Sequence, residues 1–197
     1  MHKYPVRNPD QQGHIDGLCG LYSVLNACNL LLGLDERQDA HLFSALCKGA
    51  PGLFPDIVCD GVGLRGVQDL LRVAGAWIAD VPGGRRLRFT LEMAGPPLGG
   101  LDAVFTGWRE GLATHRSADS DAVWIVGLGP PWNHWTVIEH VGAAELRFRD
   151  SWGIKERRFA DFTLDPAESG AAPGRKIMLD YHQSLLVLLS PRVRPLA

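Results

Sequence analysis

The chain has 197 residues, of which 46% are hydrophobic and 21% are charged, and its formal net charge is -2. This length and composition are typical of one globular domain with a substantial core, and they argue against intrinsic disorder. A net charge so close to zero gives no global attraction to nucleic acid or to an anionic membrane, so neither is expected as a partner.

The sequence predicts neither a membrane anchor nor a metal site. No apolar run reaches the roughly 18 residues of a membrane-spanning helix, and the start of the chain lacks the apolar core of a signal peptide. The cytosol is therefore the default location, although export by a specialised secretion system is compatible with the sequence. Its four cysteines lack the spacing of a zinc site and are expected to be free thiols. No cofactor is expected.

The first half of the chain predicts helices. Residues 1–12 are polar and suggest an extended lead-in. A buried helix with Cys19 in its first turn is expected, because apolar side chains from Leu21 to Leu32 recur at the spacing of one helical face. Gly33 is a fitting stop signal and Asp16 a plausible N-cap. Further helices are expected over about Asp35 to Lys48, Leu64 to Ala74 and Leu101 to Ala113, with a Gly- and Pro-rich loop over 49–63 and a short strand at Leu87 to Leu91.

The second half predicts strands. Past Ser120 the sequence consists of short β-branched or aromatic runs that are separated by turn residues. The runs cover residues 122–127, 135–139, 145–149 and 185–189, and residues 191–197 are expected to be a loose tail. Helices first and an antiparallel sheet second predict an α+β fold, in a single domain over residues 1–197.

Cys19 is the candidate nucleophile. A thiolate is stabilised in the first turn of a helix, where unpaired backbone N–H groups and the helix dipole favour negative charge. The flanking Gly17 and Gly20 would let a substrate carbonyl approach the backbone, so that the Cys19 N–H donates to a developing oxyanion. On this segment alone, a small residue that merely fits a tight turn explains the pattern equally well.

His134 has the surroundings of a catalytic base. A turn that contains Gly129 and two prolines delivers it to the first position of a strongly β-forming run. Trp132 and Trp135 would shield its imidazole from water, and such shielding strengthens an ion pair with a thiolate. A lone histidine at a strand start is more often structural, so the interpretation depends on what the fold brings beside it.

Asp150 is the candidate partner of His134. It ends the next predicted strand, and Gly142 lies midway between the two residues. An antiparallel hairpin that turns near Gly142 brings them together, so that Asp150 accepts a hydrogen bond from one ring nitrogen and fixes the tautomer. An Asp at a strand end is usually a turn former, and the joint pattern therefore counts for more than any single residue. His140 lies too near the turn for this role and is expected to be exposed.

Two blocks of the sequence resemble the papain-like cysteine peptidase superfamily. The segment from His134 to Asp150-Ser151-Trp152-Gly153 is similar to the His–strand–turn–strand–Asn-Ser-Trp-Gly segment of papain-family peptidases. The segment from Gln12 through Cys19-Gly20 resembles the Gln…Asp-Cys-Gly segment of the related bacteriocin-leader peptidases, whose triad is also Cys, His and Asp. Residues 34–120 match neither pattern.

The resemblance implies a papain-like fold, with the nucleophile on a long buried helix that packs against a C-terminal antiparallel sheet. It also implies a cysteine peptidase or amide hydrolase in which Cys19 attacks a protein or peptide substrate, His134 is the base and Asp150 orients it. Gln12, or alternatively Gln11, would contribute to the oxyanion hole. The residues that would line the cleft are His14, Asp16, Trp132, Trp135 and Trp152.

Two alternatives stay open at the level of sequence. The same three residues would also serve a protein glutamine deamidase or a transglutaminase-like acyl transferase, because pocket shape rather than the triad separates these reactions. The second alternative is an inactive papain-like module that only binds a partner. Retention of all three residue types favours an enzyme. The motifs do not encode the substrate, the oligomeric state or whether the protein acts in its own cell or in a target cell.

Overall fold

The computed structural model describes residues 17–54, 56–80, 85–91, 99–116 and 120–191. Its helices are α1 (Cys19–Leu32), α2 (Glu36–Gly49), α3 (Asp56–Cys59), α4 (Leu64–Asp80) and α5 (Gly100–His115), with 3-10 turns η1 (Pro51–Leu53) and η2 (Phe159–Asp161). The strands are β1 (Arg85–Leu91), β2 (Asp121–Leu128), β3 (His134–Val141), β4 (Glu145–Arg149), β5 (Glu156–Arg158), β6 (Phe162–Thr163) and β7 (Ile177–Pro191). The predicted α+β class is confirmed.

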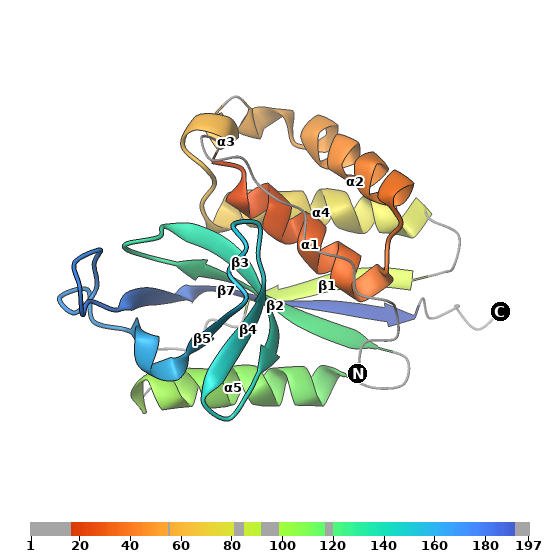
Figure 1. Cartoon of the computed structure of the whole chain (residues 1–197). Helices are drawn as coiled ribbons and strands as arrows, with labels where there is room; N and C mark the ends of the chain where they lie inside the picture. The colour runs from red at the N-terminus through yellow and green to blue at the C-terminus, as the bar shows by residue number, and fades with distance from the viewer. Residues whose placement is uncertain (1–16, 55, 81–84, 92–98, 117–119, 192–197) are drawn as a thin grey trace.

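One sheet runs through the middle of the molecule, between α1 to α4 on one face and α5 on the other (Figure 1). Its strand order is β1-β7-β2-β3-β4-β5, with antiparallel neighbours throughout, and the short β6 adds a parallel pair with β7. The last strand of the chain therefore lies between β1 and β2. Among the described residues, no helix has both the length and the apolar character to span a membrane.

Both faces of the sheet are buried, which explains why its central strands are apolar almost without interruption. In β2, Val123 and Ile125 pack with the helical layer, whereas Trp124 and Val126 pack with α5. This alternation is the period of two that a strand imposes on its side chains. Two hydrophobic clusters result, and α1 lies in the one that faces α2 and α4.

Helix α1 begins at Cys19, in agreement with the predicted position of this residue in the first turn. Twelve of its 14 residues are buried, because the helix packs against both the sheet and its helical neighbours. It ends at Gly33, whose left-handed backbone (φ 65°) allows its N–H to bond with the carbonyl of Asn29. Leu18 occupies the N-cap position without a side-chain cap, and Asp16 lies outside the described residues.

The other helices agree with their predicted positions except for one end and one loop. Asp35 caps α2 and forms a reciprocal capping box with Gln38. Helix α4 extends to Asp80 rather than Ala74, because Ile78 continues its buried stripe and tertiary packing outweighs the low helix propensity of Gly75. The loop predicted over 49–63 contains the short elements η1 and α3.

Candidate active site

His134 and Asp150 form a buried pair at the open ends of the β3–β4 hairpin. The hairpin closes through a hydrogen bond from the Gly142 N–H to the carbonyl of Glu145, so that β3 begins and β4 ends at the same edge. Nε2 of His134 lies 2.6 Å from Oδ2 of Asp150, and both side chains are fully shielded from solvent. The hairpin thus brings together two residues that are 16 positions apart in the sequence.

The carboxylate of Asp150 is fixed by the turn that follows it. Its second oxygen, Oδ1, accepts hydrogen bonds from the backbone N–H groups of Trp152 (2.8 Å) and Ile154 (3.2 Å). Gly153 has a left-handed backbone (φ 81°), which a glycine adopts without strain, and its N–H bonds with the carbonyl of Asp150. The Asp-Ser-Trp-Gly segment is therefore a turn that holds one carboxylate oxygen and leaves the other to the imidazole.

The loop before β3 sets the direction from which His134 enters the site. The N–H groups of Trp132 and Asn133 both bond with the carbonyl of Gly129, and Asn133 has a positive φ of 44°. Asn tolerates this left-handed conformation better than most residues. The loop is tied to β7 because Gly129 and Pro130 exchange backbone hydrogen bonds with Met178, each of 2.9 Å. His134 therefore starts β3 from a fixed position.

Cys19 is the other side chain that acts on the imidazole. It is the first residue of α1, 6% exposed, and its sulfur lies 3.8 Å from the carbonyl oxygen of Gly17. Because Nε2 of His134 is bonded to Asp150, the ring nitrogen left for a thiol is Nδ1. This atom is buried and has no hydrogen-bond partner in the described part of the chain, yet Cys19 is close enough to shift the pKa of the ring.

The electrostatics of the site favour a charged imidazole. Burial alone lowers the pKa of His134, but the hydrogen bond with Asp150, the interaction with Cys19 and the charges of both raise it to about 9. Burial likewise works against ionisation of Asp150, and its bonds with His134 and with the backbone of Trp152 outweigh this effect and lower its pKa. At neutral pH these shifts favour an imidazolium beside an ionised carboxylate, next to Cys19.

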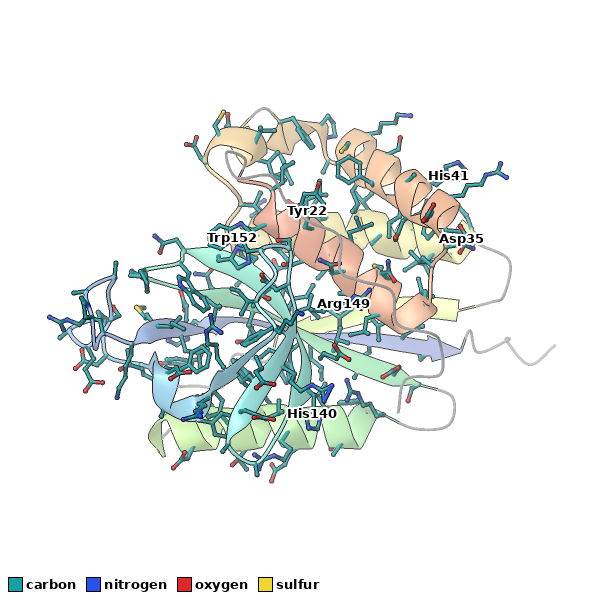
Figure 2. The ribbon with its side chains drawn as sticks, in the orientation of Figure 1. Tyr22, Asp35, His41, His140, Arg149 and Trp152 are labelled. Atoms are coloured by element: carbon teal, nitrogen blue, oxygen red, sulfur yellow. The ribbon has the colours of Figure 1, made fainter. Side chains whose placement is uncertain are left out.

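Trp152 covers the histidine ring. The two rings stack with centroids 4.0 Å apart and planes inclined by 18°, while 48% of Trp152 remains exposed. Figure 2 shows this side chain near the start of α1, on the side of the sheet that faces the helical layer. One face of the indole thus shields His134 and part of the side chain faces solvent.

The two tryptophans expected to shield His134 have other contacts that the structure shows. Trp135 is buried in the cluster beneath α1, where its indole N–H donates to the carbonyl of Val62 at 2.6 Å. Trp132 packs with the cluster on the α5 face and lies under the guanidinium of Arg157. Trp152, rather than either of them, stacks on the imidazole.

The two glycines beside Cys19 make room for the chain itself. A Cβ at Gly17 would lie 2.6 Å from the backbone nitrogen of Gly61, and one at Gly20 would lie 2.3 Å from the side chain of Val62. The Gly17 N–H also bonds with the carbonyl of Val58 at 2.6 Å. The space that was expected to admit a substrate carbonyl at these glycines is thus filled by the segment after α3, which buttresses the start of α1.

The remaining predicted residues include several that the structure does not describe. Gln11, Gln12, His14 and Asp16 lie outside the described residues. His140 is exposed, as predicted. Sequence reasoning missed Val62, which packs against Gly20, the residue after Cys19, and whose carbonyl accepts the Trp135 indole N–H. The Gly61-Val62-Gly63 sequence, which permits a close approach of two backbones, was the available signal. In the described part of the chain, no three His, Cys, Asp or Glu side chains are grouped as metal ligands would be.

Comparisons with known proteins give no relative for this chain. No family model, no curated protein and no solved structure matches it.

Proposed function

We propose that this protein is a cysteine peptidase or amide hydrolase of the papain-like kind, with Cys19 as nucleophile, His134 as general base and acid, and Asp150 as the group that orients the histidine. The observation that carries the proposal is the buried His134–Asp150 pair of 2.6 Å, whose remaining ring nitrogen is left to Cys19 at the first residue of α1. The resemblance of the His-to-Gly153 segment to papain-family peptidases supports it.

Each residue has a physical reason for its role. The imidazolium form of His134, which its raised pKa favours, stabilises a thiolate on Cys19 by charge. The first turn of α1 adds the positive end of the helix dipole, and it also adds backbone N–H groups that have no partner within the helix. Asp150, held by two backbone N–H groups, keeps Nε2 occupied and so presents Nδ1 to the sulfur.

The reaction then follows the pattern of acyl transfer through a thioester. The Cys19 sulfur attacks the carbonyl carbon of an amide, and the Cys19 N–H donates to the oxyanion that develops. His134 gives its proton to the leaving nitrogen, the C–N bond breaks and the acyl group remains on the sulfur. Water, deprotonated by His134, then attacks the thioester and releases the acid and the thiol. Gln12 or Gln11 would supply a second oxyanion donor, as the resemblance implies.

Alkylation by iodoacetamide at about pH 6 tests the thiolate directly, because the chain carries its own controls. Cys59 is exposed and Cys47 partly buried, with the pKa of Cys47 raised by burial. An ordinary thiol with a pKa near 8.5 is below 1% ionised at this pH, so a paired Cys19 should react about a hundredfold faster than Cys59. A Cys19 that reacts no faster than Cys59 in the wild-type protein would remove the basis for this function.

A peptide library derived from a whole proteome then separates the reactions that a thiolate can catalyse. Peptide cleavage produces new amino termini, whereas glutamine deamidation produces a small mass gain without a break, and acyl transfer joins an added amine to the peptide. We expect new termini that Cys19→Ala abolishes. Rapid alkylation of Cys19 with no modified peptide at all would point to the binding module instead.

A further inference from the structure

Thr136 is a buried residue of β3 to which the site described above gives no role. It is 1% exposed, and by strict hydrogen-bond geometry its Oγ1 has no partner among the residues that the structure describes. A buried hydroxyl without a partner costs free energy, and such groups are uncommon in folded proteins. The position of Thr136 in the sheet indicates which group it serves.

The register of β3 and β4 places Thr136 opposite Asp150. Val137 pairs with Arg149, so the next step along both strands brings Thr136 and Asp150 together. Directly opposed residues of an antiparallel pair have Cβ atoms about 4.5–5.5 Å apart, and their side chains point to the same face of the sheet. The hydroxyl of Thr136 therefore faces the carboxylate of Asp150.

Two other observations agree with this placement. The same register opposes His134 to Trp152 two residues further along, and these two rings stack with centroids 4.0 Å apart. The side chain of Thr136 is also close enough to Asp150 to contribute to the lowered pKa of that carboxyl. Because alternate residues of a strand share a face, Thr136 and His134 approach one carboxylate from neighbouring positions on β3.

The carboxylate of Asp150 has room for one more donor. An ionised carboxylate offers about four acceptor positions, two on each oxygen. Oδ1 accepts from the backbone N–H groups of Trp152 and Ile154, and Oδ2 is bonded to Nε2 of His134. The remaining position is on Oδ2, and the register brings the hydroxyl of Thr136 to this side chain.

A donor at this position affects the balance of charge in the pair, because burial opposes both of its charges. Burial is the largest single effect on the pKa of His134 and on that of Asp150, and in each case it favours the neutral form. Across the 2.6 Å between Nε2 and Oδ2, transfer of the ring proton to the carboxylate would leave an imidazole beside a carboxylic acid. A hydroxyl that donates to Asp150 favours the carboxylate and so keeps the proton on the ring.

We infer that Thr136 is a positioning residue, whose hydroxyl donates to Asp150 and keeps this carboxylate ionised, so that His134 stays an imidazolium beside Cys19. The catalytic consequence rests on the proposed function, whereas the hydrogen bond does not. The proton on Nε2 then remains on the ring while the proton on Nδ1 moves to the leaving group. Arg149 cannot replace the hydroxyl, because it is opposed to Val137, which packs with the helical layer on the other face of the sheet.

Thr136→Val tests this inference, because valine keeps the shape of threonine and lacks the hydroxyl. Ser184 supplies the matched control: it is also 1% exposed, its hydroxyl has no partner in the described ranges, and it lies two strands from Thr136, on the far side of Val126. At pH 7, Thr136→Val should raise the equilibrium constant of unfolding roughly tenfold to a hundredfold, since it removes a hydrogen bond to a charged group. Ser184→Ala should change this constant by less than about threefold.

The dependence of this loss on pH separates a hydrogen bond from packing. Because folding lowers the pKa of Asp150 from 3.8, the contribution of the hydroxyl is complete above about pH 3.8 and is lost as the pH falls further and the carboxyl takes up a proton. In urea unfolding, the difference between wild type and Thr136→Val should therefore narrow in acid. The carbon-13 shift of the Asp150 carboxyl should titrate at higher pH in Thr136→Val than in wild type. If the valine variant does not fold, Thr136→Ala is compared with Thr136→Ser in the same way.

Alkylation of Cys19 by iodoacetamide at about pH 6 measures the catalytic consequence. Thr136→Val should react roughly threefold to tenfold more slowly than wild type, because part of the imidazolium that stabilises the thiolate is lost. Thr136→Ser keeps the hydroxyl and should recover most of the rate, and Ser184→Ala should react as wild type does.

Two outcomes would overturn the inference and leave the hydrolase proposal standing. If Thr136→Val is as stable as wild type or more stable at pH 7, the hydroxyl has no partner, because removal of an unpartnered hydroxyl stabilises a core. If its loss of stability is the same at every pH, the role of Thr136 is packing. Slow alkylation of Cys19 in wild type would instead remove the proposed function, and the unfolding data would still decide whether Thr136 donates to Asp150.

Discussion

The start and the middle of α1 each carry a cysteine, and the two are placed in opposite chemical environments. Cys28 is fully buried among apolar side chains, and burial, together with the nearby charge of Asp39, raises the pKa of its thiol to about 12. Cys19 lies in the first turn, where the imidazole of His134 acts on it. The same residue type on the same helix is thus an inert apolar filler at one position and a nucleophile candidate at the other.

The comparison predicts that a helix activates a thiol only at its amino-terminal end. In the middle of α1 every backbone N–H is bonded within the helix, and a thiolate at Cys28 would face a carboxylate. In the first turn the backbone N–H groups have no partner within the helix, and strand β3 places the imidazole of His134, whose raised pKa favours its charged form, at the same end. The four predictions below test this comparison, in order of decreasing effect.

Replacement of Cys19 by alanine and replacement of Cys28 by alanine should have different consequences. Cys19→Ala should lower peptide cleavage by about 10⁴–10⁶-fold, because the covalent intermediate can no longer form. Cys28→Ala should leave the rate within about threefold and lower the free energy of unfolding by about 1 kcal/mol, since it leaves a small cavity in the core. Library cleavage and urea unfolding measure the two effects, and similar losses of activity in both variants would contradict the comparison.

Replacement of the carboxylate beside each cysteine should also distinguish the surroundings of Cys19 from those of Cys28. Asp150→Asn should lower the cleavage rate by about 10²–10⁴-fold, because the imidazole loses the charge that holds its orientation and its proton. Asp39→Asn should leave cleavage intact and should not make Cys28 reactive, because burial is the larger cause of its raised pKa. Iodoacetamide labelling at about pH 6, with each cysteine followed by mass spectrometry, gives both results.

The raised pKa of His134 predicts that stability falls with rising pH. Since the pKa is about 9 in the folded protein against an ordinary value of 6.5, the proton on His134 stabilises the fold fully below about pH 6.5. This contribution, roughly 3 kcal/mol, disappears as the pH rises through about 9. Asp150 acts in the opposite sense, because its lowered pKa stabilises the fold above about pH 3.8 and that part is lost in acid.

Chemical denaturation between pH 6 and pH 10 measures this slope. His134→Gln should flatten it, whereas His140→Gln should leave it unchanged, since His140 is exposed on the same strand. A slope that survives in His134→Gln would mean that another group titrates in this range.

Loss of the ring that covers His134 should have the smallest effect. Trp152→Ala exposes the imidazole to water and weakens its ion pair with the thiolate, so kcat/KM should fall about tenfold, and Trp152→Phe should restore most of it. Trp132→Ala should leave catalysis unchanged at comparable cost in stability, because Trp132 packs on the α5 face. Steady-state kinetics on one cleaved library peptide would distinguish the three variants.

Local patterns alone determined much of this fold. The helical periodicity and the stop at Gly33 predicted α1, the Asp35 cap predicted α2, and the turn at Gly142 predicted the hairpin that joins His134 to Asp150. These features are legible because each depends on residues within one element or one turn. The end of α4 was predicted too early for the same reason, because its last turns depend on packing against other elements.

Only the tertiary structure decided which neighbours each site residue has. Three features join segments that are distant in the sequence. They are the insertion of β7 between β1 and β2, the stack of Trp152 on His134 and the packing of Val62 against Gly20. Residue spacing carries no information about such contacts, because they depend on how the layers meet. The sequence by itself determined the residue types of the candidate site and the elements that carry them, whereas the packing of the layers determined which ring covers the histidine.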